Sequence, residues 1–145
     1  MLNRNWIATH IPHQGGMCLL DTVTEWSPGR IRCASASHRR IDNPLRDGGK
    51  LGAACGIEYA AQAMAVHGAL IAGDDAKPRQ GFLASVRGVE FHVDRLDDIA
   101  ADLDIEAERL SGDDNGILYR FEVRGGERVL LSGRAAVILN AEAVK

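Results

Sequence analysis

Residues 51–73 read LGAACGIEYAAQAMAVHGALIAG and contain the long helical candidate of this chain, from about Leu51 to Ile71. A helix on a protein surface normally carries a polar face about half its width. Here small residues lie on every side of the helix: Gly52, Ala53, Ala54, Gly56, Ala60, Ala61, Ala63, Ala65, Gly68 and Ala69. Each glycine costs up to about 1 kcal/mol of helix stability relative to alanine. We therefore expect other backbone to surround this helix and to pack closely against it.

The same stretch is long enough to span a bilayer. Its bulk is alanine and glycine, which contribute little transfer free energy, and Glu58, Gln62 and His67 lie near its middle. Ionisable and polar residues are costly inside a membrane. A buried helix of a soluble protein is therefore the preferred interpretation, with no membrane span. The N-terminus has no apolar segment of the kind that a signal peptide needs.

The sequence outside this helix predicts an antiparallel sheet. A hairpin precedes the helix, and four strands follow it, one of which alternates polar and apolar residues from Asp102 to Glu108. The expected strands are Leu19–Trp26, Arg30–Ser37, Phe82–Val93, Asp102–Glu108, Leu118–Arg124 and Arg128–Leu139, with turns at 27–29, 111–116 and Gly125-Gly126. Only the sheet can cover the helix, so it must curl around it. The expected fold class is α+β, in one domain spanning residues 1–145.

Composition excludes several functional classes. The 145 residues are 46% hydrophobic and 26% charged, which is ordinary for a globular protein and excludes disorder, a collagen-like repeat and a heptad rod. A net charge of −3 provides no basic footprint for nucleic acid. The three cysteines, Cys18, Cys33 and Cys55, form no CxxC pair. Free thiols in apolar surroundings favour a reducing cytosol, so we expect a cytoplasmic protein.

Motifs for the common cofactors do not occur. The sequence contains no GxSxG elbow, no P-loop and no dinucleotide-binding fingerprint. None of His10, His13, His38 and His92 has a carboxylate or a second histidine at i+3 or i+4 within an expected helix, so no metal site is expected. No metal or redox cofactor is implied.

Glu58 is the candidate catalytic residue. It lies in the middle of the expected helix, where Cys55, Glu58 and Gln62 point in nearly the same direction. Apolar surroundings raise the pKa of a carboxyl group toward the range of a general acid. A buried ion pair with an arginine or a loop cap explains Glu58 equally well. Gln62 could hold the Glu58 carboxyl group, donate to a bound carbonyl, or serve as an interface amide, whereas Tyr59 and His67 are expected to be structural.

Four segments resemble the 3-hydroxyacyl-[acyl-carrier-protein] dehydratases that have the hotdog fold. IPHQ (11–14) with MCLLDTV (17–23) is similar to the opening "LPHR…LLVDRV" of that family. GIEYAAQA (56–63) resembles the helix "IEAMAQAA", GFL (81–83) with Glu90-Phe91 resembles "FLGIDKARF", and residues 93–103 resemble "VVPGDQLRLEV". The likeness runs from about residue 9 to residue 139. It is strongest to the shortened dehydratase-like proteins found with aryl polyene biosynthesis.

The resemblance implies a fold, a site and a partner. The sheet would be the antiparallel sheet of the hotdog fold, curled around one long central helix. The acid of the family corresponds to Glu58 and its glutamine to Gln62, with Cys55 and His13 beside the bound substrate. Hotdog proteins pair edge to edge and share their active sites, so a homodimer or a heterodimer with a related hotdog subunit is implied. The substrate would be an acyl thioester on acyl carrier protein or coenzyme A, in fatty-acid or polyene biosynthesis.

One departure from the family concerns the catalytic base. In the dehydratases the loop "GHFPGHPVMPG" precedes the helix, and its first histidine is the base. The equivalent stretch, Pro44–Gly52, is about five residues shorter and contains no histidine, so the base of the family has no counterpart here. By resemblance His13 lies near the substrate entrance and is not the base, although His13 or His38 could supply a substitute. The first hypothesis is therefore a 3-hydroxyacyl-thioester dehydratase with Glu58 as general acid. The alternatives are a non-catalytic partner subunit of an active dehydratase and an acyl thioesterase.

Overall fold

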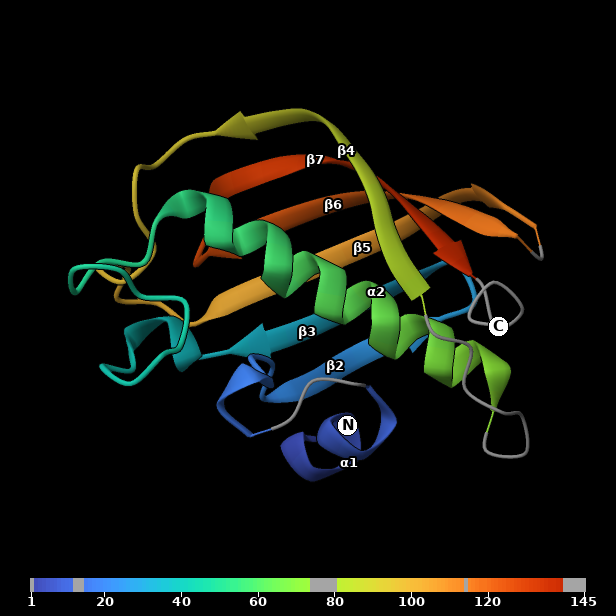
Figure 1. Cartoon of the computed structure of the whole chain (residues 1–145), viewed down its shortest axis with the longest axis horizontal. Coiled ribbons are helices and arrows are strands. Elements are labelled where there is room, and N and C mark those ends of the chain that lie inside the picture. The colour runs from blue at the N-terminus through green and yellow to red at the C-terminus, as the bar shows by residue number, and fades with distance from the viewer. Residues whose placement is uncertain (1, 12–14, 74–80, 114, 140–145) are drawn as a thin grey trace.

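A seven-stranded antiparallel sheet curls around one long helix, α2 (Gly56–Ala72), in the computed structural model (Figure 1). The structure describes residues 2–11, 15–73, 81–113 and 115–139. The strand order is β1-β2-β3-β5-β6-β7-β4. Helix α2 crosses the concave face of the sheet, and the short helix α1 (Arg4–His10) lies near the β2 side. The predicted α+β class, with an antiparallel sheet wrapped around one helix, is confirmed.

The elements follow the predicted order, with small shifts in their bounds. The strands are β1 (Leu2–Asn3), β2 (Thr22–Ser27), β3 (Arg30–Ser35), β4 (Gly81–Phe91), β5 (Leu103–Gly112), β6 (Gly116–Gly125) and β7 (Arg128–Leu139), and the 3-10 turns are Gly15–Met17, Ser37–Arg39 and Ala53–Cys55. The sequence did not predict β1 or α1. The final hairpin turn lies one residue later than predicted, because Gly125 pairs with Arg128 and leaves Gly126 and Glu127 in the turn.

The core lies between α2 and the concave face of the sheet. Along β5 the residues alternate between buried and half-exposed, as the polar–apolar alternation predicts. The largest fully buried side chains come from α2, from the strands that it covers, from α1 and from the segments that flank them: Tyr59, Tyr119, Phe121, Ile7, Leu19, Leu20, Ile31, Leu51, Leu96, Leu103, Ile105 and Leu130. Burial of this kind is the main favourable term in the stability of the fold.

Helix α2 begins five residues later than the predicted start at Leu51. The backbone before it hydrogen-bonds to the loop after β4: Leu51 N–H donates to Asp97 Oδ1 over 2.8 Å, and Leu96 N–H donates to Leu51 O over 2.8 Å. Ala53 N–H donates to Asp94 O over 3.0 Å. Leu51 O, which would accept a bond in a helix that starts at Leu51, is thus engaged outside it, and residues 53–55 form a 3-10 turn, so α2 starts at Gly56. Glu58 consequently lies in its first turn, and the prediction that it lies mid-helix is wrong.

The surroundings of α2 differ from the prediction that other backbone encloses it. One face of α2 is buried, whereas Ile57, Ala61, Ala65 and Gly68 remain partly exposed on the other. Close packing does explain Gly56, where an added Cβ would lie 2.5 Å from Leu131 Cδ2. At Gly68 such an atom would meet nothing within 4 Å. Among the residues that the structure describes, no helix is both long and apolar enough to cross a membrane.

Strand β4 forms one edge of the sheet. It pairs only with β7, so in the described ranges its outer backbone groups face no other strand. Its ladder is interrupted twice, between Leu83 and Ser85 and between Arg87 and Glu90. Gly88, in the second interruption, has a φ of 60°, which favours glycine. The edge is therefore free and bulged.

Candidate functional site

Glu58 is the third residue of α2 and lies half-buried at the helix N-terminus. A carboxylate in the first turn of a helix interacts favourably with the partial positive charge of the helix dipole. Its Oε1 accepts a hydrogen bond of 3.3 Å from Gln62 Nε2, one turn further on. The carboxyl group is thus held by Gln62 and remains half-exposed.

Gln62 is fully buried and links α2 to the segment before β2. Its Nε2 donates to Met17 O over 2.7 Å as well as to Glu58, and its Oε1 accepts from Leu19 N–H over 2.9 Å. Both N–H groups of the amide are therefore engaged within the chain. Gln62 fixes the first turns of α2, and Glu58 with them, relative to the Met17–Leu19 backbone.

The two other predicted site residues lie differently. Cys55 directly precedes α2 and is half-buried, and its Sγ donates to Leu45 O over 3.9 Å. Burial raises the pKa of the Cys55 thiol, which favours the neutral form. His13 falls outside the described residues. Cys55, Glu58 and Gln62 thus lie at or near the N-terminal end of α2.

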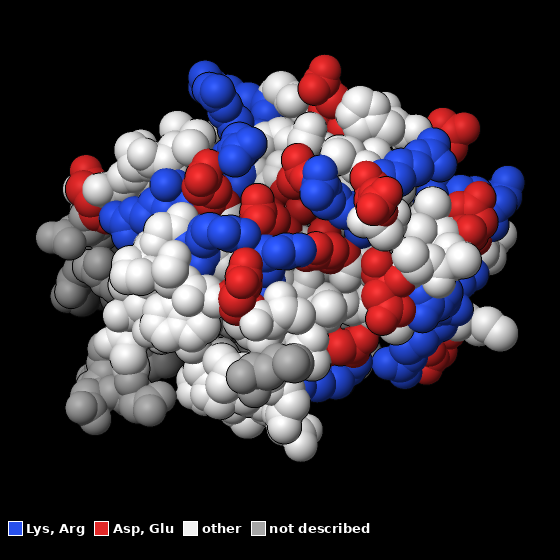
Figure 2. Space-filling model, turned by 180° about the vertical axis from the view of Figure 1, so that it is seen from behind, with Lys and Arg blue, Asp and Glu red and all other residues white. Residues whose placement is uncertain are grey.

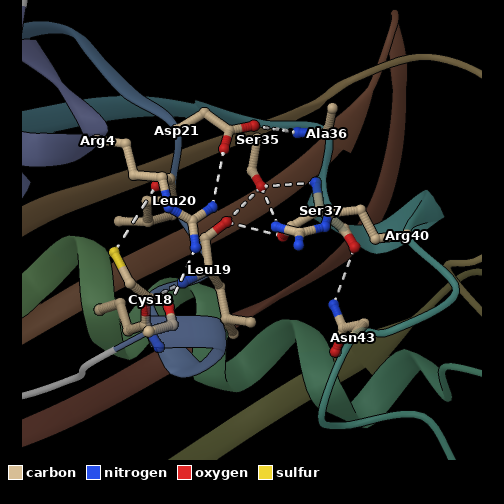
Figure 3. Close-up of polar contacts among 12 residues, drawn as sticks. Arg4, Cys18, Leu19, Leu20, Asp21, Ser35, Ala36, Ser37, Arg40 and Asn43 are labelled. Carbon is tan, nitrogen blue, oxygen red and sulfur yellow. Dashed lines mark hydrogen bonds and ion pairs between the residues drawn. The ribbon is translucent and has the colours of Figure 1, made fainter. Parts of the chain in front are cut away.

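A buried polar cluster around the Leu19 backbone was not predicted (Figure 3). Leu19 O accepts hydrogen bonds from Ser35 Oγ over 2.5 Å and from Ser37 Oγ over 2.7 Å. Ser37 Oγ also lies 2.8 Å from Tyr59 OH, and Asn43 Nδ2 donates to Ser37 O over 2.9 Å and to Tyr59 OH over 3.1 Å. Because Gln62 binds the N–H of the same Leu19, this cluster joins α2 to the end of β3. The alternating Ser35 and Ser37 at the end of an apolar strand were the signal available in the sequence.

His38, one of the two possible substitute bases, is fully buried in the 3-10 turn after β3. Its Nε2 lies 2.9 Å from Ile99 O. A carbonyl oxygen only accepts, so this nitrogen carries the proton. The Nδ1 atom is buried without a hydrogen-bond partner among the described residues. Burial lowers the pKa of His38, which keeps the imidazole neutral.

His67 occupies a sealed site near the other end of α2. Its Nε2 donates to Ser27 O over 2.7 Å, and its Nδ1 accepts from Tyr119 OH over 2.7 Å. Burial lowers the pKa of His67 and raises the pKa of Tyr119 to about 12, so both groups are neutral. This arrangement ties α2 to β2 and β6, and it matches the structural role expected for His67.

No feature of the described part of the chain suggests a metal centre, since no three His, Cys, Asp or Glu residues gather there to hold an ion. A shallow hollow of about 320 Å³ lies on the outer face of the sheet, lined by Thr24, Glu25, Arg32, Ala34, Asp102, Leu103 and Asp104. Arg32 and Asp104 form an ion pair within it. This hollow lies on the opposite side of the sheet from α2, so it is not part of the candidate site.

Comparison with protein families matches residues 6–144 to the ApeP-like family, described as ApeP dehydratase. The chain belongs to the ApeP-like dehydratase family. It is a dehydratase-like hotdog protein, as the resemblance of its segments predicted. The family match begins within α1, covers the Leu19 cluster and α2, and therefore includes Cys55, Glu58 and Gln62.

Solved structures confirm the hotdog fold. The dehydratase heterocomplex ApeI:P from Xenorhabdus doucetiae aligns over 94% of this chain and 92% of its own, with a TM-score of 0.83 and 23% identity. AziG from S. sahachiroi aligns over 81% and 89%, with a TM-score of 0.61 and 13% identity. Thioesterase HI1161 from Haemophilus influenzae aligns over 81% and 76%, with a TM-score of 0.58 and 8% identity. Comparison with curated proteins finds no match.

Proposed function

We propose that this chain is a subunit of a dehydratase that removes water from a 3-hydroxyacyl thioester, with Glu58 as the general acid. The observation that carries the proposal is the position of Glu58 in a chain of the ApeP-like family. Its carboxyl group is half-exposed in the first turn of α2 and is held by Gln62, which is itself fixed to Met17 and Leu19. A catalytic acid needs both a fixed position and access to the substrate.

In the proposed reaction, Glu58 donates its proton to the 3-hydroxyl oxygen of the acyl chain. The bond between C3 and that oxygen breaks, and water leaves. A base takes a proton from C2, and the electron pair of the C2–H bond forms the double bond of a 2-enoyl thioester. The products are the unsaturated thioester and water, so no cofactor is consumed.

We place the base outside the Pro44–Gly52 stretch, which contains no histidine. His38 is a poor candidate because its Nε2 donates to Ile99 O and its ring is fully buried. We propose that a second hotdog subunit supplies the base. Within this chain, His13 is the remaining candidate. Two features support a second subunit: the edge of β4 is unpaired in the described structure, and the similar ApeI:P dehydratase is a heterocomplex.

The carrier of the thioester is proposed to be an acyl carrier protein, with coenzyme A as the alternative. The similarity to shortened dehydratases of aryl polyene biosynthesis favours a polyene or fatty-acid pathway. The three cysteines, Cys18, Cys33 and Cys55, are all unpaired, which supports a reducing cytoplasm.

Intact-mass analysis of a 3-hydroxyacyl carrier protein incubated with this protein tests the proposal. The wild type is expected to remove one water from the acyl group. Glu58→Gln should lower this rate about 10²- to 10⁴-fold, the usual contribution of a general acid. Glu127→Gln, in the exposed turn between β6 and β7, is the matched control and should leave the rate unchanged. Equal rates for wild type and Glu58→Gln would show that Glu58 is not the acid.

A non-catalytic partner subunit is the second candidate function. The absence of a histidine from Pro44–Gly52 favours it, as does the engagement of both Gln62 N–H groups within the chain. In the same assay a folded protein that leaves the substrate mass unchanged would support this function. Release of the free 3-hydroxy acid would instead identify a thioesterase, an activity carried by the similar hotdog protein HI1161.

A further inference from the structure

The outer face of the sheet carries charged residues of both signs (Figure 2). Most of the arginines on its inner strands are paired within the chain. Arg30 lies 2.7 Å from Glu106, Arg120 lies 2.9 Å from Glu108, Arg124 lies 2.6 Å from Glu122, and Arg32 pairs with Asp104. Three of these pairs join neighbouring strands, and Arg124–Glu122 lies within β6, so charges of opposite sign compensate one another on this face.

The balance fails at the β4 edge. The strand register places Arg120, Arg134 and Arg87 side by side across β6, β7 and β4. Arg120 has its partner in Glu108, but Arg134 and Arg87 are exposed and form no ion pair with a described residue. Glu90 is the one acidic residue of β4, and it lies in the adjacent row, opposite Ser132. Among the described residues, Arg87 and Arg134 therefore lie in one row at the β4 edge without an ion-pair partner.

Pairing of β4 with a second copy of itself brings these cations together. The longest antiparallel overlap, Gly81 with Phe91, places Arg87 opposite Ser85 of the second copy. The two Arg87 side chains then become diagonal neighbours, about 7–8 Å apart on the same face. A register that pairs Arg87 with Glu90 of the second copy retains only residues 86–91. That register is also centred on the interruption at Gly88, where β4 is bulged. A self-paired β4 therefore keeps its full overlap only with the two Arg87 side chains close together, and it avoids their repulsion only with a much shorter overlap.

We infer that β4 pairs with a hotdog subunit of different sequence, whose edge strand presents carboxylates on its outer face opposite Arg87 and next to Arg134. Such a partner retains the full overlap of the strand and completes the alternation of charge that the rest of the outer face shows. The inference rests on the proposed pairing with a second hotdog subunit. It adds the chemistry by which that subunit is chosen, because like charges at an edge disfavour the wrong partner.

A charge-reversed copy of this chain serves as a partner of the stated chemistry. Wild type and Arg87→Glu are mixed in equal amounts, and native mass spectrometry counts the two homodimers and the heterodimer. Random association gives as much heterodimer as the two homodimers together. At about 10 mM salt, where the Debye length is about 30 Å, we expect about three times as much heterodimer as the two homodimers together. At about 1 M salt, where charges are screened beyond about 3 Å, the excess should disappear.

Arg30→Glu is the matched control, since Arg30 lies in the same row of the outer face but four strands away, about 19 Å at the usual strand spacing. Its mixture with wild type should remain at the random ratio, once thermal melts show that both variants are folded. A random ratio for Arg87→Glu at low salt, or no dimer in that mixture, would overturn the inference. This readout is association alone, so failure of the Glu58 assignment would leave it unaffected.

Discussion

Helix α2 carries a polar group near each end, and the protein surrounds the two groups in opposite ways. Glu58, in the first turn, is half-exposed and is held by Gln62. His67, eleven residues from the start of the helix, is fully buried, and both of its ring nitrogens are hydrogen-bonded. A group whose hydrogen bonds are all made inside the protein stabilises the fold but has none left for a substrate. A half-exposed carboxyl group remains accessible to a substrate and can transfer a proton to it.

The largest expected effect is on the rate of dehydration. Glu58→Gln should lower turnover about 10²- to 10⁴-fold while changing the free energy of unfolding by less than about 1 kcal/mol, because the side chain is half-exposed. His67→Gln should show the reverse pattern, with lost stability and near-normal turnover per folded molecule. Turnover and urea unfolding measured on the same two preparations check this. Equal loss of turnover in both variants would contradict the assignment of a catalytic role to Glu58 and a structural role to His67.

The next effect is on stability at the sealed end. His67→Ala should lower the free energy of unfolding by about 3 kcal/mol, since it leaves a cavity and removes the hydrogen-bond partner of Tyr119 OH and Ser27 O. Tyr119→Phe removes only the hydroxyl group and should cost about 1 kcal/mol. Urea denaturation of each variant measures both values. A cost for His67→Ala no greater than that for Tyr119→Phe would show that the site is less tightly packed than its burial indicates.

Gln62 should show a mixed response, because it serves both the fold and Glu58. Gln62→Ala removes the partners of Leu19 N–H and Met17 O and should cost about 2 kcal/mol of stability. It also removes the hydrogen bond from Gln62 to the Glu58 carboxyl group, so turnover per folded molecule should fall as well. Turnover and unfolding measured together separate the two effects. Normal turnover in a destabilised Gln62→Ala protein would limit Gln62 to a structural role.

Acid should lower the stability of the protein through its buried histidines before it protonates the carboxylates of the ion pairs. Burial lowers the pKa values of His67 and His38, so below about pH 6.5 the unfolded chain binds protons that the native protein does not. Stability therefore falls as the pH drops below that value, by at most about 1.4 kcal/mol per pH unit for each histidine. Thermal melts between pH 7.5 and about pH 5 measure the slope. His67→Gln should reduce it, and an unchanged slope would assign the effect to other groups.

The smallest effects compare two glycines of α2. Gly56→Ala should cost about 1 kcal/mol, because the new methyl group meets Leu131 in the fully buried core. Gly68→Ala meets no atom within 4 Å and should stabilise the isolated chain by about 0.5–1 kcal/mol. Melting temperatures measured in dilute solution check both signs. A destabilising Gly68→Ala would indicate that another surface packs against this face of the helix.

Local patterns were sufficient to predict the fold. The alternation in β5 records which side of that strand is buried, and the turn between β2 and β3 marks a hairpin, so the order of the main elements and the curled sheet followed from the amino-acid sequence, whereas β1 and α1 did not. The small residues of α2 predicted backbone on every side of the helix, but one of its faces is partly exposed. Helical spacing also predicts that Glu58 and Gln62 lie one turn apart on the same side, which agrees with the hydrogen bond between them, whereas Cys55 lies before the first residue of α2.

Tertiary contacts decided the features that no local pattern contains. The start of α2 depends on Leu51 and Ala53 bonding to the 94–97 loop, and the role of Gln62 depends on Leu19, forty-three positions away in the chain. The position of β4 at the edge beside β7 likewise results from strand pairing between distant segments. These contacts bring together residues far apart in sequence, and a backbone group forms a hydrogen bond wherever the packed chain places a partner. The sequence pattern therefore predicts which residues are buried, whereas the hydrogen-bond partner of each group depends on how the distant segments pack.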